Sequence, residues 1–287
     1  MASYVGMNMK YDRQLEIQLS HVKIDKTKIL GSGKFGTVYN ASLLQNSIFS
    51  EVAAKIPIPG SKEATKSILC EIKVMAFLGN HPNVLRLIGA STAGIRRGNQ
   101  EFKNKVCCFI NDVKVVFFLQ GNVYVFTEYC KHGSLLSYLH SKVGTFGNEI
   151  TKAPDLDRVG LVQQFCRFGK EVAVGMDYIC SKKVVHGDLS ARNILLDENL
   201  VCKISDFGLS TKLYNAAYLN KKLAYVPWRW MAIETLDRMS FSSKSDVWSF
   251  GIVLWEIFSM GYCSFILSSF PENIFKWKFH FKLAGLS

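Results

Sequence analysis

The sequence predicts an α+β fold with two lobes: a small antiparallel β-sheet lobe that carries one helix, and a larger, mainly helical lobe that is incomplete. Short β-type runs broken by glycine fill residues 22–54, as in an antiparallel sheet. Helical patterns dominate from residue 135 onward. The chain of 287 residues is 48% hydrophobic, so it can bury a substantial core and is long enough for two lobes.

The expected elements follow one another along the chain. Strands are predicted in "VKIDKTKILGSGKFGTVYNASL" and "EVAAKIPI", and a helix in "SKEATKSILCEIKVMAFLG", which Gly79 ends. A short connection near residues 127–133 leads to helices in "LVQQFCRFGKEVAVGMDYI" and "SDVWSFGIVLWEIF". We expect the last of these to be the central buried helix of its lobe. The N-terminal lobe is therefore assigned to residues 1–130 and the C-terminal lobe to residues 131–287.

The composition narrows the functional classes. The net charge of +12 is compatible with a nucleic-acid or anionic-membrane partner, but the lysines and arginines are scattered, so no nucleic-acid partner is expected. The eight cysteines include no C-x-x-C pair, which favours reduced, cytosolic thiols. No signal-peptide pattern opens the chain, and no window has the ~18 uninterrupted apolar residues of a membrane span. As written, the chain is expected to be soluble and cytoplasmic.

A glycine-rich hairpin and a lysine form the first candidate site. Residues 31–36, "GSGKFG", lie between two predicted strands, where glycines allow backbone N–H groups to approach phosphate oxygens, although such glycines are more often plain turn residues. Lys55 ends the strand "VAAK" and would point under this hairpin. Glu71 lies mid-helix among apolar residues, so we expect it to pair with Lys55 rather than be buried alone. The alternative is a solvated Glu71 on the outer face of the helix.

The stretch "VVHGDLSARNILL" and the later "SDFGLS" carry the second candidate site. Asp188 has the spacing of a catalytic base, Asn193 follows five residues on as a magnesium ligand, and Asp206 supplies another ligand. Magnesium prefers few carboxylates plus substrate phosphates, and phosphoryl transfer needs mainly positioning and charge neutralisation. Taken singly, Asp188 could be an N-cap and Asp206 part of a turn. Their joint order favours a site for ATP and Mg²⁺.

The motifs "GSGKFGTV", "VAAK", "HGDLSARN", "DFG", "RWMAIE" and "DVWSFG" together resemble a protein kinase over roughly residues 22–261. "DLSARN" and "VPWRWMAIE" resemble the tyrosine-specific branch, in which Pro227 and Trp230 would shape a deep groove for a phenolic hydroxyl. The stretch "NVYVFTEYCKHGSLLSYL" is similar to growth-factor receptor kinases of the platelet-derived and vascular endothelial type.

The resemblance implies roles for individual residues. Its catalytic group would be Lys55, Glu71, Asp188, Arg192 and Asn193, and its metal ligands would be Asn193 and Asp206. The implied ATP contacts are Gly31, Ser32, Gly33, Lys34, Gly36, Val38, Ala53, Lys55, Thr127, Glu128, Cys130 and Leu195. Among these, Thr127 would be the gatekeeper, and Glu128 and Cys130 would offer hinge backbone groups to adenine. The activation-loop tyrosines would be Tyr214, Tyr218 and Tyr225, which could instead be ordinary half-buried aromatics.

The chain departs from the family pattern at two single positions. Gly187 stands where most kinases have arginine before the catalytic aspartate, so ordering of the activation segment by phosphorylation is expected to be weaker. Ile233 replaces the proline of the usual Ala-Pro-Glu, while Glu234 is kept. In the family, that glutamate pairs with an arginine far downstream, which the sequence after residue 261 does not supply.

Two longer segments also depart from the pattern. Residues 99–121 interrupt the match, and after residue 261 the family's later helices are missing. We interpret these as a retained intron and a read-through, which sequencing of the spliced transcript would test. The alternative for residues 99–121 is a genuine β-hairpin extension, because "KVVFFL" has strand character.

The expected function is transfer of the ATP γ-phosphate to tyrosine in protein substrates, in a domain that could dimerise. The alternatives are a catalytically weak or inactive, pseudokinase-like module that binds nucleotide or a partner, and a misspliced fragment. By the resemblance, the full-length product would be a plasma-membrane receptor. This domain would lie on its cytoplasmic side, and the membrane would be reached only through parts not present in this chain.

Overall fold

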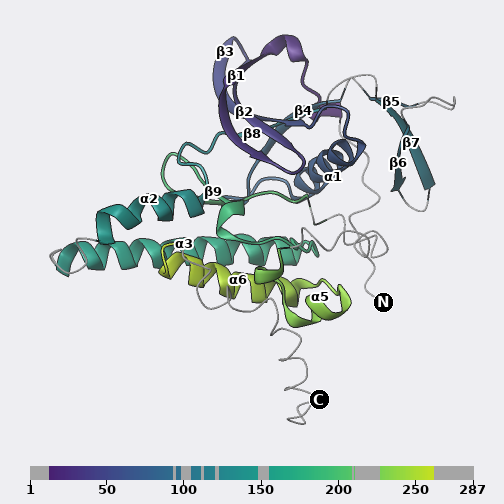
Figure 1. Ribbon diagram of the computed structural model, residues 1–287. Coiled ribbons are helices and arrows are strands. Elements are labelled where there is room, and N and C mark those ends of the chain that lie inside the picture. Colours follow the sequence, from purple (N-terminus) through teal and green to yellow (C-terminus); the bar gives the residue numbers. More distant parts are fainter. Residues whose placement is uncertain are drawn as a thin grey trace.

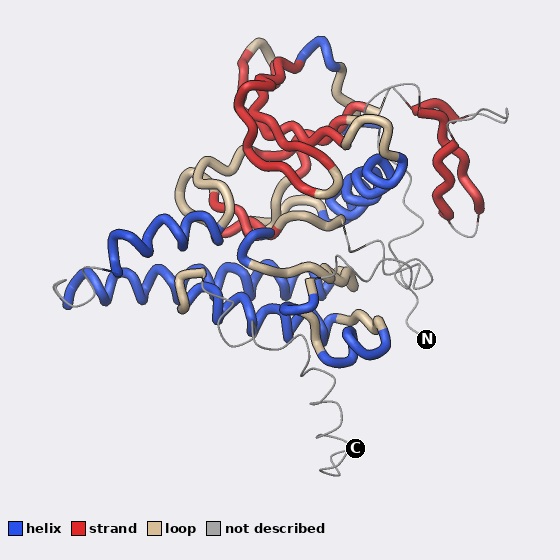
Figure 2. Tube along the Cα trace, in the orientation of Figure 1, coloured by secondary structure: helices blue, strands red, loops and turns tan. Residues whose placement is uncertain are grey.

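The computed structural model describes residues 13–92, 95–97, 105–110, 113–119, 123–147, 155–208, 210 and 227–261. It has the two predicted lobes, with strands gathered in one lobe and helices in the other (Figure 1). One helix, α1, lies beside the strands of the small lobe, as Figure 2 shows by its colour. The α+β, two-lobed fold class predicted from the sequence is therefore confirmed.

The small lobe is built on one antiparallel sheet of five strands in the order β1-β2-β3-β8-β4. Its strands are β1 (Val22–Gly33), β2 (Gly36–Gln45), β3 (Ile48–Pro57), β4 (Leu87–Ser91) and β8 (Tyr124–Glu128). Ala54 of β3 and Phe126 of β8 are register partners, and both are fully buried. This register fixes Lys55, the next residue on β3, beside Val38 of β2.

Helix α1 (Lys62–Leu78) ends at Gly79, the stop that the sequence predicted. Ser61 caps its first turn by accepting a hydrogen bond from the Ala64 N–H, and Gly79 ends it with a φ of 69°. Ile68 and Ile72 are buried against Val125 of β8 in one apolar cluster. Since Glu71 neighbours Ile72 on the buried side, packing of the helix brings a carboxylate toward the sheet.

The segment between β4 and β8 forms a separate sheet. Its strands are β5 (Ile95–Arg97), β6 (Lys105–Ile110) and β7 (Val113–Leu119), in the antiparallel order β5-β7-β6. Figure 1 places them beyond α1, away from the five-stranded sheet. This is the strand conformation that the β-hairpin alternative predicted, whereas the origin of the segment in a retained intron stays a prediction.

The large lobe packs long helices under a short hairpin. Its elements are α2 (Leu135–Gly147), α3 (Asp155–Ser181), η4 (Ala191–Asn193), β9 (Ile194–Leu196), β10 (Cys202–Ile204), η7 (Trp228–Trp230), α5 (Ile233–Arg238) and α6 (Ser243–Phe258). The core joins Leu139 of α2, Phe168 of α3, Ile204 of β10 and Ile257 of α6. Among the helices of the described residues, none is both long and apolar enough to cross a bilayer.

Helix α6 corrects one expectation. It begins with a reciprocal capping box between Ser242 and Ser245, and its inner face carries the fully buried Val253 and Ile257. Its other face is not buried: Trp248 and Trp255 are 51% and 53% exposed. The helix is therefore central to the lobe on one side only, because these tryptophans are about half exposed among the described residues.

Candidate active site

The glycine hairpin joins β1 to β2, with Gly33 paired to Gly36 across the turn. A Cβ atom at Gly36 would overlap the carbonyl oxygen of Ile56, so close strand packing requires glycine there. At Gly31 and Gly33 a Cβ would meet no atom within 4 Å. The backbone of β1 is therefore open at these two glycines, as a loop that approaches a phosphate requires.

Lys55 meets two carboxylates. Its Nζ lies 2.7 Å from Oε2 of Glu71 on α1 and 3.7 Å from Oδ1 of Asp206, which follows β10. The Lys55–Glu71 pair expected from the sequence is present, and the solvated alternative for Glu71 is wrong because this residue is buried. One ammonium group thus joins the sheet, the helix and the large lobe.

Both carboxylates of this group stabilise the charged form of Lys55. Burial lowers the pKa of Lys55, but the nearby carboxylates of Glu71 and Asp206 outweigh it and raise the pKa above its ordinary value. Burial raises the pKa of Glu71, and the Lys55 ammonium opposes that shift. The 2.7 Å contact favours the charged pair, so Lys55 stays a cation at every physiological pH.

Replacing Glu71 with glutamine is expected to reduce phosphotransfer, because Lys55 loses the charge that holds it in place. A hydrogen bond to a charged group contributes about 1.5–3 kcal/mol, which corresponds to a loss of about 10- to 150-fold. Steady-state kcat and the KM for ATP would measure it. The matched control is Glu198→Gln, which changes an exposed glutamate. Equal kinetics of the two variants would contradict the assigned role of Glu71.

The loop that carries Asp188 is anchored from below by Asp246 of α6. The carboxylate of Asp246 accepts hydrogen bonds from the backbone N–H groups of His186 at 2.8 Å and Gly187 at 2.9 Å. The His186 ring bridges the Ser205 carbonyl, at 3.0 Å from Nε2, and the Asp188 N–H, at 3.2 Å from Nδ1. These partners assign the proton to Nε2. Gly187 has a φ of 77°, a left-handed conformation that glycine adopts without strain.

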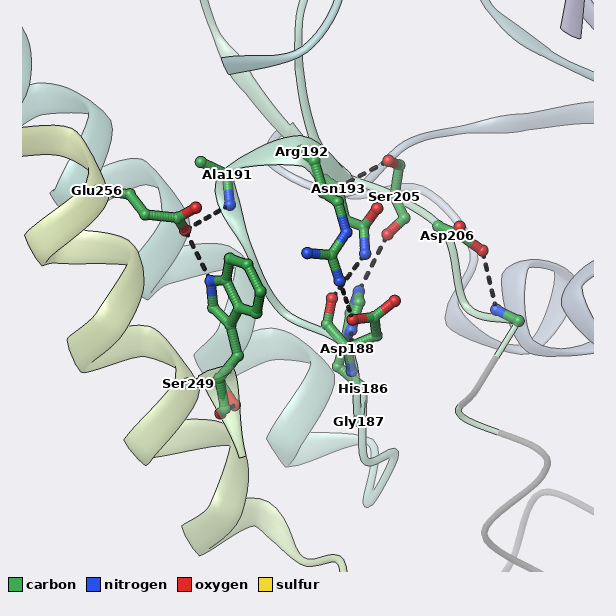
Figure 3. A network of polar contacts seen from close by, with 12 residues as sticks. His186, Gly187, Asp188, Ala191, Arg192, Asn193, Ser205, Asp206, Ser249 and Glu256 are labelled. Carbon is green, nitrogen blue, oxygen red and sulfur yellow. Dashed lines mark hydrogen bonds and ion pairs between the residues drawn. The ribbon is translucent and has the colours of Figure 1, made fainter. Parts of the chain in front are cut away.

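Three side chains converge at the tip of this loop (Figure 3). Arg192 Nη2 donates to Asp188 Oδ1 at 2.6 Å, and Asn193 Nδ2 donates to the Asp188 carbonyl at 2.7 Å. Burial raises the pKa of Asp188, and the Arg192 guanidinium only partly opposes this shift. The result is a positioned carboxylate that is a stronger base than aspartate in water.

Asp206 supplies a second carboxylate, whose pKa is lowered whereas that of Asp188 is raised. Burial would raise its pKa, but Lys55 and the Gly208 N–H, which donates at 3.3 Å, bring the pKa below its ordinary value. Asp206 is therefore ionised. Asn193 donates through its nitrogen, so its amide oxygen is left to act as an acceptor or ligand. One carboxylate and one amide oxygen form a hard donor set that suits a divalent cation shared with substrate phosphates.

A buried glutamate links residues 186–193, the loop that carries Asp188 and is predicted to be the catalytic loop, to η7. Oε2 of Glu256 accepts from the Ala191 N–H at 2.8 Å and from Trp230 Nε1 at 3.0 Å, as Figure 3 shows. The Trp230 ring in turn lies under the Arg192 guanidinium, 4.5 Å from its centroid. Arg192, the partner of Asp188, is thus held by the segment that is predicted to form the substrate groove.

The residues between the lobes form the proposed hinge. The Glu128 N–H donates to the Arg86 carbonyl at 3.1 Å, so this donor is already used and the predicted contact of Glu128 with adenine would not involve it. The Glu128 carboxylate lies 3.5 Å from Lys203 Nζ on β10 and so ties the hinge to the large lobe. Burial raises the pKa of the Cys130 thiol to about 12, which keeps it neutral.

Other predicted positions fall into three groups. The sheet register brings Val38 beside Lys55 and Ala53 beside Thr127, while Leu195 lies on β9 in the other lobe. Ile233 and Glu234 are exposed at the start of α5. The tyrosines Tyr214, Tyr218 and Tyr225 lie outside the described residues, so their roles and the effect of Gly187 on them stay predictions.

Sequence reasoning missed Asp246 and Glu256, the two acids that anchor the catalytic loop. Both lie in the apolar helix "SDVWSFGIVLWEIF", where an unpaired carboxylate is costly to bury. The same argument that found Glu71 could have found them. Their partners could not be named, because they are backbone N–H groups some sixty residues away in the chain.

Comparisons with known proteins agree with this geometry. Residues 24–98 and 104–274 match the model of the family described as protein tyrosine and serine/threonine kinase. The chain is 31% identical over 275 residues to the myoblast growth factor receptor egl-15 of Caenorhabditis elegans, covering 89% of this chain and 24% of the relative. It is 33% identical over 291 residues to vascular endothelial growth factor receptor 1 of Homo sapiens, covering 82% and 20%.

A third relative covers more of both chains. The tyrosine-protein kinase receptor old-1 of Caenorhabditis elegans is 30% identical over 285 residues, which cover 95% of this chain and 51% of the relative. A two-lobed fold with an open glycine hairpin, a paired lysine and an anchored catalytic loop defines a phosphotransferase domain. The chain belongs to the protein tyrosine and serine/threonine kinase family. It spans 19–51% of the length of the curated relatives it matches.

The family match also bears on the segments that depart from the pattern. It omits only residues 99–103 of the insertion and continues to residue 274, beyond the end of α6. The lobe boundary at residue 130, the anomalous segment 99–121 and the truncation after about residue 261 stay predictions.

Proposed function

We propose that this chain transfers the γ-phosphate of ATP to tyrosine in protein substrates. The observation that carries the proposal is the convergence of Lys55, Glu71 and Asp206 in one charged group, with Asp188 and Asn193 on an anchored loop nearby. These elements are remote from one another in sequence. Their arrangement supplies a cation for phosphate oxygens and a base for the attacking hydroxyl, which is what phosphoryl transfer needs.

Each residue has a distinct part in the proposed reaction. Lys55 holds phosphate oxygens of ATP beneath the glycine hairpin. Asp188 orients the substrate hydroxyl and accepts its proton as the phenolic oxygen bonds to the γ-phosphorus. The bond from that phosphorus to the bridging oxygen breaks, and ADP leaves. Arg192 keeps the Asp188 carboxylate in place through its 2.6 Å contact.

Asn193 and Asp206 are the residues that would hold Mg²⁺. The ionised Asp206 and the amide oxygen of Asn193 fit this cation better than a softer metal. Bound magnesium would neutralise phosphate charge and favour departure of ADP. Lys55, 3.7 Å from Asp206, shares this carboxylate and so aligns the phosphate and cation sites.

The preference for tyrosine is supported by the substrate side of the site. Trp230 is fixed through Glu256 and stacked by Arg192, which places a rigid aromatic wall next to the catalytic loop. The matched relatives are named as receptors, and old-1 is named a tyrosine-protein kinase receptor. On this basis the domain would act on the cytoplasmic side of a plasma-membrane receptor, phosphorylate protein partners and form kinase-domain dimers.

The experiment that tests the proposal compares three peptides that differ only in one residue: tyrosine, serine or phenylalanine. Purified chain, ATP and Mg²⁺ are expected to phosphorylate the tyrosine peptide alone, and EDTA is expected to stop the reaction. Radiolabel transfer measures it, with Asp188→Asn as the blank. Equal labelling of serine and tyrosine would contradict the specificity. No labelling above the blank would favour the nucleotide- or partner-binding module instead.

A further inference from the structure

Helix α6 presents a half-exposed apolar stripe, of which only the Phe258 end has a ring partner among the described residues, Phe165 of α3 at 6.1 Å between centroids. Val247, Trp248, Trp255 and Phe258 are 68%, 51%, 53% and 53% exposed, although helix α6 also buries its opposite face. Val247 and Trp248 are adjacent, Trp255 follows Trp248 by seven residues, and Phe258 follows Trp255 by three, which puts all four on one side of the helix. A surface helix ordinarily has a polar outer face, so an apolar stripe of this kind marks a surface that another element covers.

The stripe has a definite shape. Between its two tryptophans lies Gly251, above which a Cβ atom would meet no protein atom within 4 Å. The glycine therefore leaves open space on the stripe, at a position between the two tryptophans in the sequence. From Val247 to Phe258 the stripe runs about 17 Å at the rise of an α-helix.

The sequence that follows α6 carries a matching pattern. In "FKWKFHFKL", residues 275–283, apolar and basic side chains alternate without exception. The apolar positions are Phe275, Trp277, Phe279, Phe281 and Leu283, and the basic or imidazole positions are Lys276, Lys278, His280 and Lys282. Alternation of period two predicts an extended segment with one aromatic face and one basic face.

We propose that residues 275–283 fold back along α6 and cover the apolar stripe with their aromatic face. Apolar side chains on one face of an extended segment recur about every 6.6 Å, so the five apolar positions of residues 275–283 span about 26 Å, enough to cover the ~17 Å stripe. An aromatic side chain can approach the helix at Gly251, where no side chain stands in the way. The lysines then face solvent, as cations require.

The end of α6 gives the tail its starting point. The Gly261 N–H donates to the Glu256 carbonyl at 2.7 Å, and the Gly261 carbonyl lies 3.3 Å from Nε2 of His140 on α2. Residues 262–274 can span up to about 43 Å when extended, which is ample to return along a ~17 Å stripe. Covalent attachment also gives the tail a high effective concentration, which favours it over a separate chain.

Covering the stripe is also expected to affect the active site, because the same helix contacts both. The buried side of α6 carries Asp246 and Glu256, which hold the backbone of the catalytic loop. A tail that stabilises α6 therefore also stabilises this anchor. The proposal itself concerns packing and does not depend on the proposed phosphotransfer.

Hydrogen exchange of the unmodified full chain is the first test. Amides of residues 275–283 are expected to exchange about 10-fold or more slowly than in a free peptide of residues 270–287, because docking restricts opening. Exchange as fast as in the free peptide would overturn the proposal. This measurement needs no variant, so it stands even if altered chains fail to fold.

Two matched triple variants test which face docks. Phe275→Ser, Phe279→Ser and Phe281→Ser together are expected to remove the protection and to raise binding of an apolar dye several-fold. Lys276→Ser, Lys278→Ser and Lys282→Ser together are expected to leave both unchanged. Light scattering reports the oligomeric state. Equal behaviour of the two variants, or protection that disappears on dilution of a dimer, would show that the tail does not cover its own helix.

Discussion

Replacing Asp188 with asparagine is expected to lower the rate of phosphate transfer to a tyrosine peptide by about 10²–10⁴-fold, the usual contribution of a positioned general base. Asparagine keeps the shape of the side chain and can still contact Arg192, but it cannot accept the proton of the attacking hydroxyl. Because the loop is anchored by Asp246 and not by the Asp188 carboxylate, the melting temperature is expected to stay close to that of the unaltered chain. Radiolabel transfer and thermal unfolding measure the two effects.

The pH profile separates a base from a merely structural aspartate. Burial raises the pKa of Asp188, so kcat/KM is expected to fall as the pH is lowered through that raised value, where the carboxylate becomes protonated. In Asp188→Asn this acid limb is expected to vanish from the residual activity. The control is Asp237→Asn on the exposed surface of α5, which should keep both the rate and the limb. An unchanged limb in Asp188→Asn would assign it to another group.

Replacing Asp246 with alanine is expected to have the largest effect on stability. Its carboxylate is the acceptor for two N–H groups of the catalytic loop, and the residue is 4% exposed. Leaving a buried donor unpaired costs about 1–3 kcal/mol, so two donors cost roughly 2–6 kcal/mol out of the ~5–15 kcal/mol that stabilises a typical domain. Urea unfolding would measure the loss, and kcat is expected to fall with it because Asp188 is no longer positioned.

The contribution of Asp246 to stability is expected to change with pH in a definite direction. Burial raises the folded-state pKa of Asp246, so the folded chain binds its proton more readily than the unfolded chain does. Stability from this group is therefore lost as the pH rises from the unfolded to the folded pKa. Asp246→Ala should remove that part of the curve, whereas Asp177→Ala, on the exposed side of α3, should retain it. Equal unfolding curves for the two variants would contradict the anchor.

Local chemistry in the sequence was enough to predict most of the small lobe and the charged group. Short β-type runs broken by glycine predicted the sheet, and the end of α1 was predicted at Gly79. Glu71 was found because a carboxylate among apolar residues needs a partner. Such arguments succeed where a residue's own neighbours in the chain already impose the physical constraint.

Tertiary structure alone decided which distant groups meet. The hydrogen bonds of Asp246 and Glu256 to the catalytic loop join segments some sixty residues apart, and no local pattern specifies that register. Which face of α6 is exposed was decided in the same way, since an apolar helix is predicted to be buried whichever of its faces has a neighbour. The sequence by itself determined which side chains could take part in phosphate chemistry. Only packing of the two lobes decided which of them stand within hydrogen-bonding distance, because that distance depends on contacts made far along the chain.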